Sequence, residues 1–184
     1  MVLVLASNSP RRRQILADAG IPFTVRAPKV PEERRSGETA DQYVRRLAEA
    51  KASAIDIAPG EIVLAADTVV VAGDEILEKP QDTADARRMI ALLAGQEHQV
   101  ITGICLRKDS QRIVDTAVTL VRFVHLNERE IADYVASGEP MDKAGGYAIQ
   151  GQASKFIDRI EGCYFNVVGL PVALVYAHLK QLGW

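Results

Sequence analysis

The chain has 184 residues, of which 48% are hydrophobic and 25% charged, a composition typical of a globular protein. The formal net charge of −2 argues against a general nucleic-acid-binding or membrane surface, so any anion binding has to be local. No apolar run approaches the roughly 20 residues of a membrane helix, and we expect no signal peptide. Cys105 and Cys163 lack metal-ligand spacing, which predicts reduced thiols in a cytoplasmic protein. The length predicts a single domain over 1–184, with two small domains as the alternative.

The first predicted elements are a strand over residues 2–6 and a helix that begins at Pro10, with Ser9 as its N-cap. Three arginines, Arg11 to Arg13, occupy the first turn. Each exposed cation there is unfavourable by roughly 0.3–1 kcal/mol, because the helix dipole is positive at this end. An anion removes that cost, so the arginines and Ser7 predict a phosphate site. The alternative is a solvated surface turn.

Helical periodicity separates the three arginines. At 100° per residue, Arg12 falls near the centre of the arc formed by the apolar residues Ile15, Leu16 and Ala19. We therefore expect Arg12 to project over the strand end, where open α/β sheets bind ligands. If Arg12 binds phosphate, Arg12→Ala should change KM or kcat with little effect on the melting temperature.

A second helix is predicted after a polar loop over residues 27–37. The sequence from Thr39 to Gln42 has the capping-box pattern, and apolar residues then recur at helical spacing up to Pro59. Lys51 lies inside this apolar arc. Its ammonium either reaches solvent at the edge of the packed face or faces a phosphate pocket.

The apolar run over residues 62–66 predicts a central buried strand, and Asp67 and Thr68 follow it directly. Burying an unpaired carboxylate costs several kcal/mol. Asp67 must therefore lie at a strand end, accept hydrogen bonds, or face cations or a metal; a role in a turn is the alternative. Lys79, before Pro80, is a second lysine that either binds phosphate or is only exposed.

The next elements are a helix capped by Asp82 or Thr83, two long strands, and a helix capped by Asn127. Residues 98–107 and 112–124 have strand length, and the short polar turn that joins them predicts an antiparallel hairpin. Helices and strands are thus intermixed. The sequence predicts an α/β or α+β fold with a mixed sheet and helices on its faces.

Residues 139–151 are rich in glycine and also carry aromatic, amide and charged groups. Glycine lets a backbone approach a ligand closely, and Tyr147 or Gln150 could meet a base by packing or by amide hydrogen bonds. An ordinary loop is the alternative. A strand over 156–160 and a last helix after Pro171 complete the predicted elements.

Six ordered motifs together carry a resemblance to a known family: Leu5 to Arg12, Ala66 to Val70, Lys79-Pro80, Gly95 to Gly103, Asp142 to Gly145, and Asn166 to Pro171. The chain resembles the Maf family of nucleoside triphosphate pyrophosphatases over essentially its whole length. The resemblance implies a long curved mixed sheet with two lobes around a cleft, similar to inosine triphosphate pyrophosphatases.

The form of residues 146–151 looks like the branch of this family that acts on dTTP and UTP. The resemblance places the catalytic aspartate on Asp67 and the specificity-linked positions on Arg11, Thr68 and Gln150. It also implies an acidic loop that falls on Glu32 and Glu33, without assigning which of the two matters.

We therefore expect hydrolysis between the α- and β-phosphates, which gives a monophosphate and pyrophosphate. Asp67 is the expected base, Mg²⁺ or Mn²⁺ the expected metal, and Thr68 and Gln150 the residues that sense the base. No metal ligand is assigned. The expected phosphate-binding residues are Ser7, Arg11, Arg12, Lys51 and Lys79.

Two alternatives stay open. One is a nucleotide-sensing regulator of cell division without essential catalysis, which the older description of the family as septum formation inhibitors suggests. The other is a pyrophosphatase for 7-methyl-GTP or modified nucleotides. The resemblance is also compatible with a homodimer, and we expect neither a nucleic acid nor a membrane partner.

Overall fold

The computed structural model describes residues 1–184, which form six α-helices and a seven-stranded mixed sheet. The strand order is β2-β1-β3-β5-β6-β7, with β4 paired to β3. The molecule divides into two compact units: the first comprises residues 1–68, 102–117 and 169–184, and the second comprises 69–101 and 118–168. The long strands β3 (Glu61–Ala72), β5 (Glu97–Lys108) and β6 (Gln111–Phe123) contribute residues to both units.

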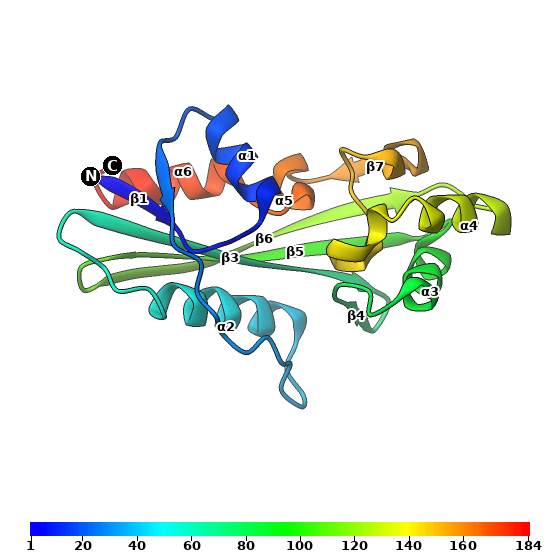
Figure 1. Cartoon of the computed structure of the whole chain (residues 1–184), viewed down its shortest axis with the longest axis horizontal. Helices are drawn as coiled ribbons and strands as arrows, with labels where there is room; N and C mark the ends of the chain where they lie inside the picture. Colours follow the sequence, from blue (N-terminus) through cyan, green and yellow to red (C-terminus); the bar gives the residue numbers. More distant parts are fainter. The chain divides into compact units, whose positions relative to one another are not determined.

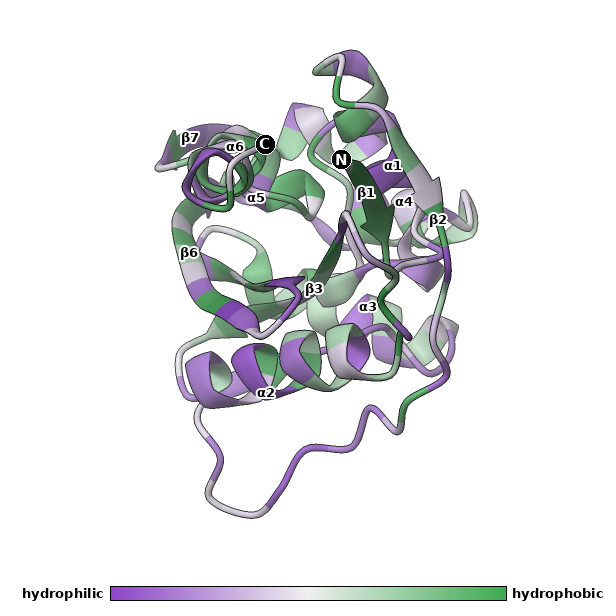
Figure 2. Cartoon of the chain, turned by 90° about the vertical axis from the view of Figure 1, so that its left-hand side faces the viewer, coloured by the Kyte–Doolittle hydropathy of each residue, from purple (hydrophilic) through white to green (hydrophobic).

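The first unit is built on parallel pairing around a buried strand. It contains β1 (Val2–Leu5), α1 (Pro10–Asp18), β2 (Phe23–Val25), α2 (Ala40–Ser53) and α6 (Val172–Gln181). Strand β1 is parallel to both neighbours, and Val4 lies opposite Thr24 and Val63. Within this unit α2 covers one face of the sheet and α1 and α6 the other (Figures 1 and 2). Cover on both faces explains why β1 is apolar throughout.

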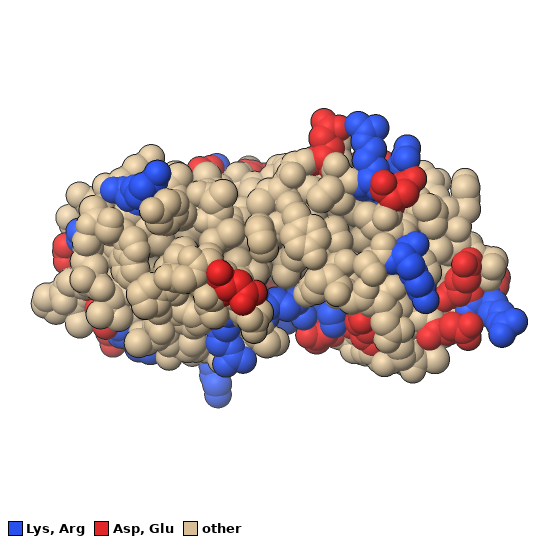
Figure 3. All heavy atoms as spheres, turned by 90° about the horizontal axis from the view of Figure 1, so that it is seen from above, with Lys and Arg blue, Asp and Glu red and all other residues tan.

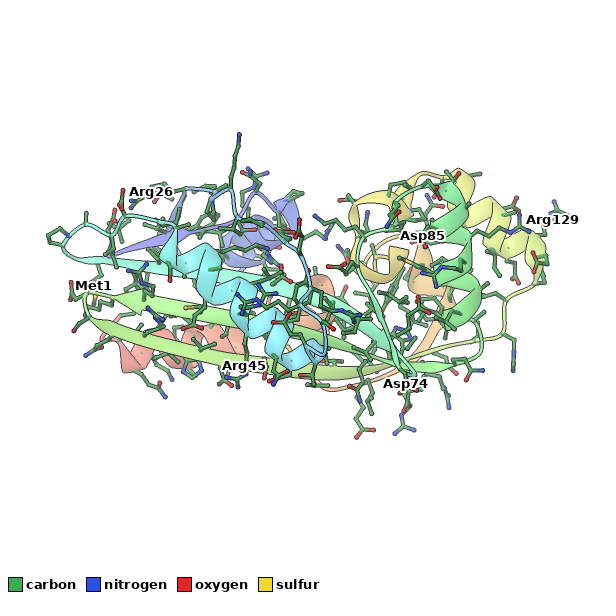
Figure 4. The ribbon with its side chains drawn as sticks, turned by 90° about the horizontal axis from the view of Figure 1, so that it is seen from below. Met1, Arg26, Arg45, Asp74, Asp85 and Arg129 are labelled. Carbon is green, nitrogen blue, oxygen red and sulfur yellow. The ribbon has the colours of Figure 1, made fainter.

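Helix α2 approaches the sheet closely because β5 carries glycine beneath it. A Cβ on Gly103 would lie 2.5 Å from both the carbonyl carbon and the carbonyl oxygen of Val44. These are backbone atoms of α2, which cannot move aside as the end of a flexible side chain can, so only glycine fits at position 103. The outer face of α2 is polar, as its colour in Figure 2 shows, and it carries the half-buried Arg45 that is labelled in Figure 4. The helix is therefore amphipathic, as the capping box and periodicity predict.

The second unit contains a separate hydrophobic core. It comprises β4 (Glu75–Leu77), α3 (Thr83–Leu93), α4 (Glu128–Ala136), β7 (Ile157–Glu161), α5 (Tyr164–Val168) and three short 3₁₀ turns, η1 (Glu139–Asp142), η2 (Ala144–Gly146) and η3 (Gln152–Phe156). Strands β4 and β7 pair antiparallel with β3 and β6. Aromatic residues at the centre of this core include Phe123, Tyr134, Tyr147 and Phe156. Asp74, labelled in Figure 4, marks the turn of the β3–β4 hairpin.

The structure confirms the predicted mixed sheet with helices, and it confirms the predicted caps. Ser9, Thr39 and Asn127 cap α1, α2 and α4, the last two with complete capping boxes. Two details differ. Strand β3 runs on through Asp67, so this residue does not lie at a strand end. A separate helix, α5, precedes α6, because the buried Asn166 donates its side-chain amide to core acceptors and fixes this turn.

Charge on the surface is mixed in sign. On the face drawn in Figure 3, Lys and Arg side chains are interspersed with Asp and Glu side chains. None of the six helices is both long and apolar enough to cross a membrane. The local charge clusters of the protein therefore carry more information about binding than its net charge does.

A buried histidine in the second unit makes stability depend on pH. His98 on β5 is 2% exposed; its Nε2 lies 2.8 Å from Tyr147 Oη, and its Nδ1 has no hydrogen-bond partner. Burial lowers the pKa of His98 from 6.5 to about 4. Between these two values the unfolded state binds a proton that the folded state does not, so stability falls as the pH falls through this window.

We expect His98→Gln to lose this part of the pH dependence. Between pH 7.5 and pH 5 the free energy of unfolding of the wild-type protein should fall by roughly 2 kcal/mol more than that of the variant. Urea unfolding at both pH values measures the difference. Parallel pH profiles for the two proteins would contradict the buried neutral state of His98.

Candidate active site

The guanidinium of Arg12 is the centre of a hydrogen-bond network in the first unit. Its Nε donates to the carbonyl oxygen of Gly169 at 2.8 Å, and an Nη atom donates to that of Ala66 at 2.8 Å. The hydroxyls of Ser7 and Thr68 each accept from an Nη atom at 3.2 Å. Arg12 therefore joins α1 to β3 and to the segment that leads into α6.

These contacts use four of the five N–H donors of the guanidinium. The inward direction predicted for Arg12 agrees with them. Burial lowers the pKa of Arg12, and the charge of Asp67 opposes this shift. These contacts lead us to expect that Arg12 also contributes to stability, whereas a role in phosphate binding alone predicts a melting temperature that is nearly unchanged when Arg12 is lost. Arg11 beside it is half-buried, whereas Arg13 is exposed.

Both hydroxyl residues predicted to bind substrate are held in place by neighbouring polar groups. Ser7 is buried, and its Oγ accepts from the backbone N–H of Ser9 at 3.2 Å as well as from Arg12. Thr68 Oγ1 lies 2.9 Å from Thr102 Oγ1 and also accepts from Arg12. The network thus fixes the side-chain rotamers of both residues, while their contacts to substrate stay predictions.

A second polar cluster joins Asp67, Lys51 and Glu32. The Nζ of Lys51, in the last turn of α2, lies 2.5 Å from Asp67 Oδ1 and 2.7 Å from Glu32 Oε1. The side chains of Lys51 and Asp67 are only 11% and 12% exposed, whereas that of Glu32 is 49% exposed. Of the possibilities that the sequence left for Asp67, contact with a cation is the one observed. Lys51 faces carboxylates rather than reaching into solvent alone.

Burial raises the pKa of Asp67, and the charges of Lys51 and Arg12 oppose this shift. A carboxylate with a raised pKa is a stronger base than an exposed one. The positive charges of Lys51 and Arg12 favour the ionised form of this carboxylate. Asp67 therefore combines two properties that suit a general base, a raised proton affinity and cations that stabilise its charged form.

Glu32 is the residue that the sequence alone did not single out from its neighbour Glu33. The backbone oxygen of Glu32 accepts from Tyr43 Oη at 2.9 Å, and that of Glu33 accepts from Arg46 at 2.9 Å. Helix α2 thus holds the loop by two contacts to its backbone, and the Glu32 carboxylate meets Lys51. No sequence pattern within the loop shows that Glu32, and not Glu33, contacts Lys51, because this contact depends on how the loop lies along α2.

Lys79 and Gln150 belong to the second unit, and both are exposed. The segments that carry them are neighbours, because the backbone N–H of Gly145 donates to the oxygen of Glu78 at 3.0 Å. In addition, Pro80 lies against Gly146. The first unit thus brings together Ser7, Arg12, Lys51, Asp67 and Thr68, and the second places Lys79 beside the glycine-rich segment.

The protein has no cluster of three or more His, Cys, Asp or Glu side chains that could hold a metal ion. Glu32 and Asp67 are nevertheless two carboxylates directed at one point, now occupied by the Lys51 ammonium. Hard oxygen donors of this kind suit Mg²⁺ or Mn²⁺, which usually take only one or two carboxylates together with substrate phosphates. The residues present therefore fit such an ion only together with an oligophosphate.

Comparison with known proteins finds relatives that match over the whole chain. A relative from Koribacter versatilis (strain Ellin345), named dTTP/UTP pyrophosphatase, is 50% identical over 184 residues, which cover 100% of this chain and 95% of the relative. A relative from Geobacillus sp. (strain WCH70), which has the same name, is 46% identical over 183 residues, which cover 99% of this chain and 98% of the relative.

A solved structure described as the Staphylococcus aureus Ham1 protein has a TM-score of 0.51 at 15% identity, covering 98% of this chain and 99% of that one. At this identity the likeness concerns the fold alone. The family model for Maf-like protein matches residues 2–182, which include both compact units. The chain belongs to the Maf family.

Proposed function

We propose that this protein hydrolyses dTTP and UTP to the monophosphate and pyrophosphate. The observation that carries the proposal is the buried Asp67 carboxylate, held 2.5 Å from the Lys51 ammonium. A buried carboxylate beside a cation can take a proton from water, while the cation stabilises charge on a phosphate. The names of relatives that are 46–50% identical over the whole length give the reaction and the nucleotides.

The roles proposed for the residues follow from their contacts. A water oxygen attacks the α-phosphorus, its proton passes to Asp67, and the bond from the α-phosphorus to the bridging oxygen breaks, so that pyrophosphate leaves. Lys51 exchanges one carboxylate contact for a phosphate oxygen. Arg12 holds Ser7 and Thr68 in position and keeps one N–H donor for the substrate. Arg11 and Lys79 add positive charge for the phosphates.

We also propose that Mg²⁺ or Mn²⁺ takes part, held by Asp67 and Glu32 together with phosphate oxygens. When bound, the ion neutralises part of the triphosphate charge. In this proposal the Glu32 carboxylate has two roles. It orients Lys51 in the absence of nucleotide, and it supplies a carboxylate when the Lys51 ammonium turns to the phosphates.

Product analysis tests the proposed function. The purified protein is incubated with dTTP, UTP, dCTP, GTP or 7-methyl-GTP, each with Mg²⁺ or Mn²⁺, and pyrophosphate and orthophosphate are measured separately. We expect one pyrophosphate per monophosphate and the highest kcat/KM with dTTP and UTP. Binding of these nucleotides without pyrophosphate release would favour the regulator instead, and a preference for 7-methyl-GTP would favour the other branch.

Gln150 is proposed to read the base. Its amide is exposed next to a buried segment, and a uracil or thymine edge offers both a donor and an acceptor to such an amide. We expect Gln150→Ala to reduce the preference for dTTP over dCTP by about three- to tenfold, the contribution of one or two hydrogen bonds. Steady-state kcat/KM for both nucleotides measures it, and an unchanged ratio of kcat/KM for dTTP to that for dCTP would exclude this role.

The remaining expectations belong to the same proposal. Cys105 and Cys163 are both unpaired, which supports a cytoplasmic location. One family model across both compact units supports a single domain over residues 1–184. A homodimer is also proposed, and light scattering of the purified protein tests it.

A further inference from the structure

We propose that Glu139 is a positioning residue that fixes the turn carrying Gln150, and that the preference for thymine or uracil over cytosine depends on this contact. The inference rests on the proposed function, in which Gln150 reads the base. It adds to that function a residue that does not touch the nucleotide and acts through the backbone next to Gln150.

Gln150 lies in a tight turn between buried residues. The backbone N–H of Gly151 donates to the oxygen of Ala148 at 3.0 Å, so that Ile149 and Gln150 occupy the two central positions of a β-turn. Tyr147, Ala148 and Ile149 are all less than 10% exposed, whereas Gln150 is exposed. The turn therefore presents the Gln150 side chain to solvent while its neighbours are packed in the core.

The Glu139 carboxylate holds the backbone directly after this turn. Its Oε2 accepts from the backbone N–H of Gln152 at 3.0 Å, and its Oε1 accepts from that of Ala153 at 3.4 Å. Tyr134 Oη also donates to Oε1, at 3.0 Å. Lys143 contacts the backbone oxygen of Glu139 rather than its carboxylate. The carboxylate of Glu139 thus serves to order the backbone of the segment after Gln150.

Gly151 leaves the space that this carboxylate occupies. A Cβ at position 151 would lie 2.5 Å from both carboxylate oxygens of Glu139. The φ of Gly151 is −104°, which any residue adopts, so its backbone conformation does not require glycine. Glycine is needed at position 151 because any side chain there would occupy the space of the Glu139 carboxylate.

The other end of the turn is fixed independently. Tyr147 Oη lies 2.8 Å from His98 Nε2 in the core of the second unit, and the Tyr147 ring packs edge-on against Phe123. With Tyr147 anchored on one side and Glu139 on the other, the turn has little freedom. An amide that discriminates bases by hydrogen bonds needs a position defined to about 0.5 Å, and these two anchors provide it.

A double-mutant cycle tests the proposal. We expect Glu139→Gln to reduce the kcat/KM preference for dTTP over dCTP about three- to tenfold, because an amide nitrogen replaces one of the two oxygens that accept from the backbone N–H groups of Gln152 and Ala153. In the Gln150→Ala background the same substitution should leave the preference unchanged. Gly151→Ala should reproduce Glu139→Gln, since the new methyl group displaces the carboxylate. Glu161→Gln, on the exposed strand β7, is the matched control and should behave as wild type.

Hydrogen exchange gives a readout that needs no catalysis. The amide protons of Gln152 and Ala153 should exchange faster in Glu139→Gln than in the wild-type protein. A full preference for dTTP over dCTP in Glu139→Gln, or an equal loss in both Gln150 backgrounds, overturns the positioning role. If the wild-type protein lacks any preference for dTTP over dCTP while Glu139 still protects the two amides, the proposed base recognition fails and the anchoring of the turn stands.

Discussion

Replacing Asp67 by asparagine is expected to lower kcat by about 100- to 10,000-fold, the range that loss of a general base produces. The amide keeps an oxygen that can accept from Lys51 Nζ but cannot take a proton from water. Nucleotide binding should persist, because Lys51 retains its ammonium and its contact with Glu32. Steady-state kinetics and calorimetric titration with dTTP separate the two effects.

The folded state should tolerate this substitution. The pKa of Asp67 is raised in the folded protein, so the folded state binds a proton more tightly than the unfolded state does. Ionisation of Asp67 therefore costs more free energy in the folded state than in the unfolded state, and stability is lost as the pH rises through the folded-state pKa. A neutral asparagine avoids that loss, and we expect no large fall in the melting temperature at neutral pH.

Asp18→Asn is a suitable control, because Asp18 is an exposed carboxylate at the end of α1 in the same unit. It should hydrolyse dTTP as the wild type does. In the wild type, kcat should decline at low pH with a pKa above the usual 3.8 of aspartate, because protonated Asp67 cannot act as a base. Near-normal turnover by Asp67→Asn would rule out the assignment of this residue as the base.

The second large effect concerns stability. We expect Arg12→Ala to lower the free energy of unfolding by about 2–4 kcal/mol, because it removes four hydrogen bonds and leaves the carbonyl oxygens of Ala66 and Gly169 without this donor. For a protein of this length that corresponds to a fall of roughly 5–15 °C in the melting temperature. Calorimetry measures it directly.

Arg13→Ala provides the comparison, since Arg13 is the exposed neighbour of Arg12 in the same helical turn. Its effect on stability should stay within about 0.5 kcal/mol. Arg12→Lys should be intermediate, because a single ammonium cannot reach acceptors on three separate segments. An Arg12→Ala variant with an unchanged melting temperature and a raised KM would instead show that Arg12 acts mainly on phosphate.

Local signals in the sequence predicted the elements well, since they depend on neighbouring residues. The N-caps at Ser9, Thr39 and Asn127 and the inward direction of Arg12 all follow from spacing within one helix. The convergence of Lys51 on Asp67 joins a helix end to the middle of a strand. The apolar run before Asp67 predicted a strand end, hydrogen bonds, a cation or a metal for its carboxylate, and only the packed fold identifies Lys51 as the partner.

The features that sequence patterns missed depend on contacts between distant segments. Glu32 is distinguished from Glu33 only by the way the loop lies along α2. The close fit of Gly151 to Glu139 joins two separate turns, and neither residue has a local pattern that predicts the contact. Helix α5 likewise depends on the amide of Asn166 finding acceptors elsewhere in its unit.

The bond from Arg12 to Gly169 also has a consequence for the order of synthesis. These two residues are separated by 157 positions, so the ribosome adds Arg12 to the chain long before it adds Gly169, whose carbonyl oxygen accepts from Arg12. At a typical rate of 5–20 residues per second, this delay amounts to roughly 8–30 s. During that time the nascent polypeptide already contains Ser7, Glu32, Lys51 and Asp67, but the Arg12 network cannot be complete. The positions that Arg12 gives to Ser7 and Thr68 are therefore completed only after Gly169 has been synthesised.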